Sequence, residues 1–167
     1  AEFSDRRVTK VIDGKPVTGW FTEDFTLAEL KTLRVRERLP ALRPGNARWR
    51  DETIATFDEA LALLKSAGRP LGIYPETKHP SYFLAIGKPM EGPLVEALAR
   101  AGYSQPTDPV FIQSFEVSNL KALRAMTKLH LVQLIDPDDP PYDQVLMRTG
   151  LTAATMITAD GLKAIKG

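Results

Sequence analysis

The 167-residue sequence contains no cysteine and only two histidines, His79 and His130. Without cysteine, the chain can form neither disulfides nor thiolate sites. The compartment stays open, because both exported and cytosolic proteins can lack this residue. Two histidines also argue against a zinc site of the usual ligand composition. The sequence therefore excludes cysteine chemistry and argues against a zinc site.

An excess of charge and long hydrophobic runs are also missing. The 22 Lys and Arg residues balance 21 Asp and Glu residues, so no basic surface points to nucleic acid. No apolar run approaches the roughly 20 residues that span a bilayer, and the start of the chain has no signal-peptide pattern. We therefore expect neither a nucleic acid partner nor an integral membrane segment. The oligomeric state stays open.

Helices and strands are predicted to alternate from about residue 56 onward. Short apolar runs bounded by Gly and Pro predict strands at about 71–76, 109–115 and 130–135. Capping boxes at Thr26 and Thr56 predict that helices begin there, over about 26–33 and 56–67. Apolar side chains at helical spacing predict the other helices: 89–101, 117–128, about 141–147 and 159–165. Asp13-Gly14 is a common turn pair after a weak strand pattern, and residues 40–53 are predicted as loop.

This alternation predicts an α/β fold in which helices cover a parallel sheet, either open or closed into a barrel. In both folds the functional groups gather at the carboxyl ends of the strands. Three consecutive predicted strands have polar residues at these ends: Glu76 and Lys78, then Gln113, Ser114 and Glu116, then Gln133 and Asp136. We therefore expect a functional site along this rim.

Glu76 and Lys78 follow the first of these strands and are two residues apart. In an extended segment such residues share one face, so the pair is either an exposed ion pair or part of a site. The sequence has no Gly-rich phosphate loop and no Gly-x-Ser-x-Gly motif. The remaining hypothesis is a hard-cation site, with Glu76 as an oxygen ligand of Ca²⁺ or Mg²⁺ and Lys78 holding an anionic group. One carboxylate binds weakly, so further acidic ligands are required.

Residues 73–80, Ile-Tyr-Pro-Glu-Thr-Lys-His-Pro, resemble the Tyr-Pro-Glu-x-Lys-x-Pro segment of the glycerophosphodiester phosphodiesterase family. The branch they resemble most is that of exported bacterial glycerophosphoryl diester phosphodiesterases. Four other blocks resemble this branch in the same order: 24–31, 54–60, 111–116 and 131–134. Five ordered blocks are far more specific than one motif.

The resemblance implies a TIM-type (β/α)₈ barrel that uses a divalent cation, Ca²⁺ or Mg²⁺, to hydrolyse glycerophosphodiesters to an alcohol and glycerol 3-phosphate. Glu76 then corresponds to a metal carboxylate of the family, and Lys78 to its basic residue near the phosphate. Phe115, Glu116 and Gln113 are expected near the substrate. The resemblance also implies a periplasmic or extracellular location and a role in lipid and glycerol metabolism.

The sequence departs from the family pattern in its first half. It contains no His-Arg-Gly, which holds a catalytic histidine in the family, and no Glu-x-Asp metal pair before residue 76. A complete barrel needs about 250 residues. We therefore expect residues 1–167 to form a single domain from the centre of an incomplete barrel, without N- and C-terminal strands, catalytic residues or activity of its own.

Two further expectations follow from these departures. His79 and His130 are expected to be a loop residue and a structural residue, and not replacements for the missing catalytic histidines. The alternative to an enzyme segment is a non-catalytic binding or structural domain of barrel ancestry that retains part of a cation and phosphate site.

Overall fold

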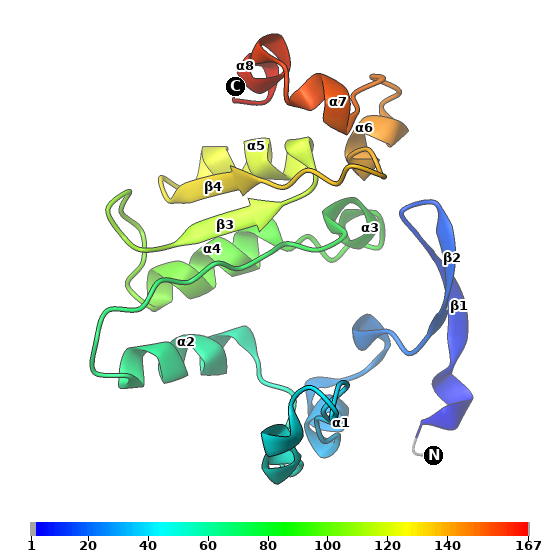
Figure 1. The fold of residues 1–167 in the computed structure, drawn as a ribbon, viewed down its shortest axis with the longest axis vertical. Helices are drawn as coiled ribbons and strands as arrows, with labels where there is room; N and C mark the ends of the chain where they lie inside the picture. Colours follow the sequence, from blue (N-terminus) through cyan, green and yellow to red (C-terminus); the bar gives the residue numbers. More distant parts are fainter. Residues whose placement is uncertain (1–2, 167) are drawn as a thin grey trace. The chain divides into compact units, whose positions relative to one another are not determined.

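The computed structural model describes residues 3–166, which divide into two compact units between Ala60 and Leu61 (Figure 1). The first unit contains η1 (Ser4–Arg6), β1 (Val8–Ile12), β2 (Lys15–Gly19), η2 (Thr22–Asp24), α1 (Leu27–Thr32), η3 (Pro44–Trp49) and the start of α2 (Phe57–Ser66). The second contains the rest of α2, then α3 (Pro80–Ala85), α4 (Glu91–Arg100), β3 (Phe111–Ser114), α5 (Val117–Met126), β4 (His130–Gln133), α6 (Tyr142–Leu146), α7 (Ala153–Met156) and α8 (Ala159–Lys166). Among the described residues, no helix is both long enough and apolar enough to cross a membrane.

The first unit opens with a β-hairpin in which β1 and β2 pair antiparallel. Its turn is Asp13-Gly14, and both residues have positive φ, +49° and +75°. Such a turn matches the right-handed twist of the two strands, and Asp-Gly is a preferred pair for it. The hydroxyls of Thr9 and Thr18 lie 2.7 Å apart across the strands. The expected Asp-Gly turn is confirmed.

Ion pairs hold the segments of the first unit together. Lys10 lies 2.9 Å from a carboxylate oxygen of Glu23 and 2.6 Å from one of Asp24. Both adjacent acids therefore form ion pairs that stabilise the first unit. Arg6 donates a hydrogen bond to Glu29 across 2.6 Å. This bond, assisted by hydrogen bonds from Thr26, lowers the pKa of Glu29 to about 2.

Both predicted capping boxes form. In α1 the backbone N–H of Thr26 donates to the Glu29 carboxylate over 2.8 Å, while the Thr26 hydroxyl accepts from the Glu29 N–H over 3.2 Å. Thr56 and Glu59 repeat these two bonds at α2 with the same two distances. Lys31 pairs with the Glu59 carboxylate and so connects the two helix starts within this unit. The two N-termini are therefore placed by local sequence.

The second unit contains a three-stranded parallel arrangement. β3 and β4 pair in parallel, and residues 73–77 run parallel along the other side of β3 (Figure 1). The N–H of Ile73 donates to the carbonyl of Pro109 over 2.9 Å, and the N–H of Thr77 donates to that of Gln113 over 3.0 Å. The expected alternation of parallel strands and helices is confirmed for this part of the chain.

The predicted strand 71–76 differs from the observed one, which consists of two separate bridges, Ile73 with Val110 and Glu76 with Gln113. Pro75 explains the interruption. Its carbonyl accepts from the N–H of Gln113 over 2.9 Å, but proline has no N–H to donate to the Phe111 carbonyl beside it. One rung of the ladder is lost, and pairing resumes at Glu76.

The core of the second unit lies between the sheet and its helices, and α5 contacts both β3 and β4 as well as α4. Its fully buried side chains are Leu98, Val110, Ile112, Ser114, Leu123, Leu129 and Met156. Five short helices among the described residues were not predicted: η1, η2, η3 within the expected loop 40–53, α3 and α7. η3 and α3 have proline in their first turn, where its fixed φ suits a helix start.

Candidate functional site

Glu76 and Lys78 lie on the same exposed side of the extended segment, as its alternation predicts. Between them Thr77 is buried, with 4% of its surface exposed. Successive side chains of an extended chain point to opposite faces, so a buried Thr77 directs its two neighbours outward. One carboxylate and one ammonium group are thus presented together at the end of the segment.

The register of the sheet places further candidates beside this pair. Glu76 pairs with Gln113, and Gln113 pairs with Val132, so these residues form one row across the three strands. Gln113 is half-buried, and its side-chain amide donates to the carbonyl of Tyr74 over 3.3 Å. Phe115, with 39% of its surface exposed, follows two residues later, as Lys78 follows Glu76. The exposed rim therefore combines charged, amide and aromatic groups.

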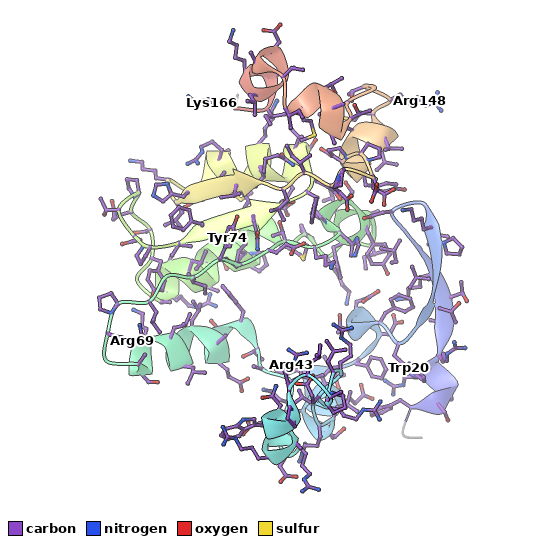
Figure 2. All side chains as sticks on the ribbon, viewed as in Figure 1. Trp20, Arg43, Arg69, Tyr74, Arg148 and Lys166 are labelled. Atoms are coloured by element: carbon purple, nitrogen blue, oxygen red, sulfur yellow. The ribbon has the colours of Figure 1, made fainter. Side chains whose placement is uncertain are left out.

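An aromatic row lies next to these residues, toward the amino ends of the strands. It includes Tyr74, which is labelled in Figure 2. The Tyr74 and Phe111 rings meet edge to face with centroids 6.3 Å apart, and Phe111 stacks on His130 at 4.8 Å. The ring of His130 therefore packs across β3 and β4. This contact supports the structural role expected for His130.

Thr77 is the inner end of a chain of hydrogen bonds. Its hydroxyl lies 2.6 Å from the side-chain oxygen of Asn119, and the Asn119 amide nitrogen donates to the Glu91 carboxylate over 2.6 Å. Asn119 is buried in α5 with 4% of its surface exposed, and Glu91 is the first residue of α4. The chain therefore joins the extended segment to both covering helices.

Glu116 lies below the exposed rim, with only 3% of its surface accessible. Its carboxylate accepts from the backbone N–H of Ser81 over 3.2 Å and from the Ser81 hydroxyl. Its own N–H donates to the Ser114 hydroxyl over 3.1 Å. These bonds hold the start of α3, immediately after Lys78. A substrate contact by Glu116 stays a prediction.

Gln133 and Asp136, the remaining candidates at strand ends, also make bonds to the protein. The amide of Gln133 donates to the carbonyls of Phe115 and Leu134 over 2.8 and 2.9 Å. The Asp136 carboxylate accepts from the N–H of Asp138 over 2.9 Å. Gln133 thus holds the backbone beneath Phe115, which makes it a supporting residue of the rim.

A divalent cation requires more ligands than this rim supplies. Glu76 offers one exposed carboxylate, which fits a single oxygen-ligand position for Ca²⁺ or Mg²⁺. Within residues 3–166, no group of three or more His, Cys, Asp or Glu side chains lies close enough together to hold a metal ion. The described residues therefore fit part of a cation site, and the predicted need for more acidic ligands stands.

Sequence reasoning missed the polar residues that support the rim: Thr77 and Asn119, which are buried, and Ser81 and Glu91, which are half-buried. One signal was present, because Asn119 falls within the apolar stretch of α5, beside the core residue Leu120. A polar side chain in a core position needs a partner, so its presence predicts a buried hydrogen bond. The identity of that partner depends on the tertiary fold.

Comparison with known proteins identifies the family of this chain. Residues 3–165 match the model of the glycerophosphoryl diester phosphodiesterase family. The chain is 38% identical over 153 residues to glycerophosphodiester phosphodiesterase GDPD6 of Arabidopsis thaliana, covering 81% of this chain and 39% of that protein. It is 30% identical over 135 residues to the glycerophosphodiester phosphodiesterase of Haemophilus influenzae, covering 70% and 37%.

A third relative, the glycerophosphodiester phosphodiesterase of Treponema pallidum, is 26% identical over 124 residues, which are 63% of this chain and 33% of that protein. The chain thus spans between a third and two fifths of the length of these relatives. The family match extends over nearly all of the described residues. The chain belongs to the glycerophosphoryl diester phosphodiesterase family.

Proposed function

We propose that this chain supplies the Glu76–Lys78 rim of a metal-dependent glycerophosphodiester phosphodiesterase with a (β/α)₈ barrel, and that residues 61–166 form its central part. The supporting observation is the exposed pair Glu76 and Lys78 with Thr77 buried between them. The parallel order of residues 73–77, β3 and β4 is compatible with one sector of such a barrel. The substrate would be a glycerophosphodiester, and the products an alcohol and glycerol 3-phosphate.

The residues of the rim have different proposed tasks. Glu76 would hold Ca²⁺ or Mg²⁺ together with carboxylates from outside the described residues, and the bound cation would polarise the phosphoryl oxygens. The Lys78 ammonium would lie against the phosphate and offset its negative charge. Phe115 would contact the apolar part of the substrate, and Gln113 would help to orient it.

Proton transfer requires groups that this rim does not offer. We propose that the general acid and base are histidines supplied by sequence outside this chain, so that residues 1–167 alone do not turn over substrate. His130 stacks on Phe111, and His79 begins α3 in a left-handed conformation with φ +54°. Neither arrangement favours a catalytic role.

The test uses the protein as its gene encodes it. Glycerol 3-phosphate release from glycerophosphocholine is measured with Ca²⁺ or Mg²⁺, and a chelator should abolish it. Glu76→Gln and Lys78→Met should each lower kcat by about 100-fold or more, since each removes charge that acts on the phosphate. The matched controls, Glu96→Gln and Lys128→Met, change exposed residues on α4 and after α5 and should retain activity.

Two results would argue against this proposal. Turnover by residues 1–167 alone, abolished by Glu76→Ala, would show that the acid and base lie within this chain. A folded full-length protein without hydrolysis and without cation-dependent stabilisation would instead support the non-catalytic binding or structural domain.

The location is a separate proposal. The resemblance to the exported bacterial branch supports a periplasmic or extracellular enzyme acting in lipid and glycerol metabolism. Fractionation of the source cells with an antibody to this chain tests it, and recovery in the cytosolic fraction would contradict it.

A further inference from the structure

We propose that Thr77, Asn119 and Glu91 form a positioning chain that sets the directions of the Glu76 and Lys78 side chains. The inference rests on the proposed function for its activity measurement, while its structural part is tested independently. None of the three residues lies on the exposed rim, so each would act through Glu76 and Lys78.

The order of donors and acceptors in this chain is fixed from its outer end. The Glu91 carboxylate accepts hydrogen bonds, so the Asn119 nitrogen must face it, across 2.6 Å. The Asn119 oxygen then faces Thr77, whose hydroxyl must donate across 2.6 Å. Turning the Asn119 amide over would place its oxygen against the Glu91 carboxylate and break that bond.

The anchored residue controls its two neighbours through the backbone. The Thr77 N–H is bonded to the Gln113 carbonyl over 3.0 Å, and its hydroxyl is bonded inside the protein. Rotation of the backbone at Thr77 would swing Glu76 and Lys78 together. With both bonds in place, that rotation is restricted, so the backbone presents Glu76 and Lys78 in constant directions.

A side-chain anchor is needed at this place because the sheet is weakened there. Pro75 removes one rung of the ladder two residues before Thr77. The positioning chain instead attaches the segment to α5 through Asn119 and to the first turn of α4 through Glu91. A carboxylate is favourable at that helix start, which stabilises the outer end of the chain.

The experiment compares variants of the protein as its gene encodes it, at temperatures where each is folded. Thr77→Val keeps the shape and removes the hydroxyl, and Thr77→Ser keeps the hydroxyl. Glu91→Ala removes the outer link at a half-buried residue, and Glu91→Gln retains an acceptor. The matched control is Thr127→Val at the far end of α5, where the hydroxyl accepts only a local bond from the Leu129 N–H over 3.2 Å.

Thr77→Val should lower kcat for glycerophosphocholine by about 10-fold or more and change KM by less than about 3-fold, since small misplacements of reacting groups are costly. Thr77→Ser and Thr127→Val should stay within about 3-fold of the unmodified protein. Glu91→Ala should also lower kcat, whereas Glu91→Gln should keep kcat close to that of the unmodified protein. If Thr77→Val does not fold, the comparison of Glu91→Ala with Glu91→Gln tests the positioning chain instead.

Amide hydrogen exchange at residues 76–78 gives the readout that does not depend on activity. Thr77→Val and Glu91→Ala should speed this exchange by about 10-fold, and Thr127→Val should leave it unchanged. Unchanged exchange and unchanged kcat in both variants would overturn the positioning chain. If the unmodified protein shows no hydrolysis, the proposed function fails, and the exchange comparison alone accepts or rejects this inference.

Discussion

The carboxylate of Glu116 accepts two hydrogen bonds from Ser81, one from the backbone N–H over 3.2 Å and one from the hydroxyl. Ser81 lies in the first turn of α3, where backbone N–H groups have no partner within the helix. Glu116, two residues after β3, thus caps the start of a helix through Ser81, which lies 35 positions earlier in the sequence. The relationship ties the start of α3 to the strand end next to it.

Glu116→Gln should destabilise residues 61–166 by about 1–3 kcal/mol, because hydrogen bonds to a buried carboxylate are replaced by weaker neutral ones and the Ser81 hydroxyl must turn to accept from the new amide. Chemical denaturation measures the free energy of unfolding, and amide exchange at 80–85 locates the change. Glu96→Gln is the control, since Glu96 is exposed on α4. Unchanged stability with lost activity would instead favour the substrate contact that the family resemblance implies.

Pro75→Ala should restore the missing rung beside β3. The new N–H can donate to the Phe111 carbonyl, which contributes about 0.5–1.5 kcal/mol, while the greater freedom of the unfolded chain costs about 0.4–1 kcal/mol. We therefore expect little change in stability but a new, slowly exchanging amide at position 75, detectable by NMR. Rapid exchange of that amide would mean that the Phe111 carbonyl does not face it.

Leu123→Ala should be strongly destabilising, because Leu123 is completely buried in α5, between β3, β4 and α4. Truncating a buried leucine typically costs about 2–5 kcal/mol through lost burial and the cavity left behind. Leu63→Ala is the matched control on α2, where 72% of the leucine surface is exposed. Equal denaturation midpoints for the two variants would contradict the assigned core.

The stability of the first unit should depend on pH through Glu29. The hydrogen bond from Arg6 lowers the folded-state pKa of this residue from 4.5 to about 2. The stabilisation is therefore complete above about pH 4.5 and is lost as the pH falls through about 2. The difference in stability between the unmodified protein and Glu29→Gln should be largest above pH 4.5 and should shrink toward pH 2.

Denaturation at several pH values, followed by tryptophan fluorescence, measures this effect, because both tryptophans, Trp20 and Trp49, lie in the first unit. Glu52→Gln changes an exposed glutamate of the same unit and should retain the pH dependence of the unmodified protein. If Glu29→Gln and the unmodified protein lose equal stability as the pH falls, the Arg6–Glu29 pair does not contribute to the pH dependence.

Local signals in the sequence predicted much of the fold. The capping boxes at Thr26 and Thr56 and the Asp13-Gly14 turn need only neighbouring residues, and all three form as expected. The prediction of a strand at 71–76 was less accurate. The apolar run identified an extended segment, but it did not show that Pro75 would remove one hydrogen bond of the ladder. α3 was missed because only six residues lie between Pro80 and Gly87, which is too short a stretch to show a helical pattern.

The exposed half of the site was also predictable, since a run ending in Glu76 and Lys78 shows its alternation directly. Its supporting half was not. The position of Glu116 after a strand did not indicate that its carboxylate accepts from Ser81, and its expected place near the substrate stays a prediction. Bonds such as Thr77 to Asn119 join residues 42 positions apart, and no local pattern encodes such a pairing.

This separation along the chain has a consequence for the order of folding. The β1–β2 hairpin needs only a two-residue turn, so it can form early and independently. The Glu76–Lys78 segment becomes anchored only after a loop of some forty residues has closed around β3 and α5. During synthesis, the Glu76–Lys78 segment can therefore be anchored in this way only once Asn119, 42 positions after Thr77, has left the ribosome.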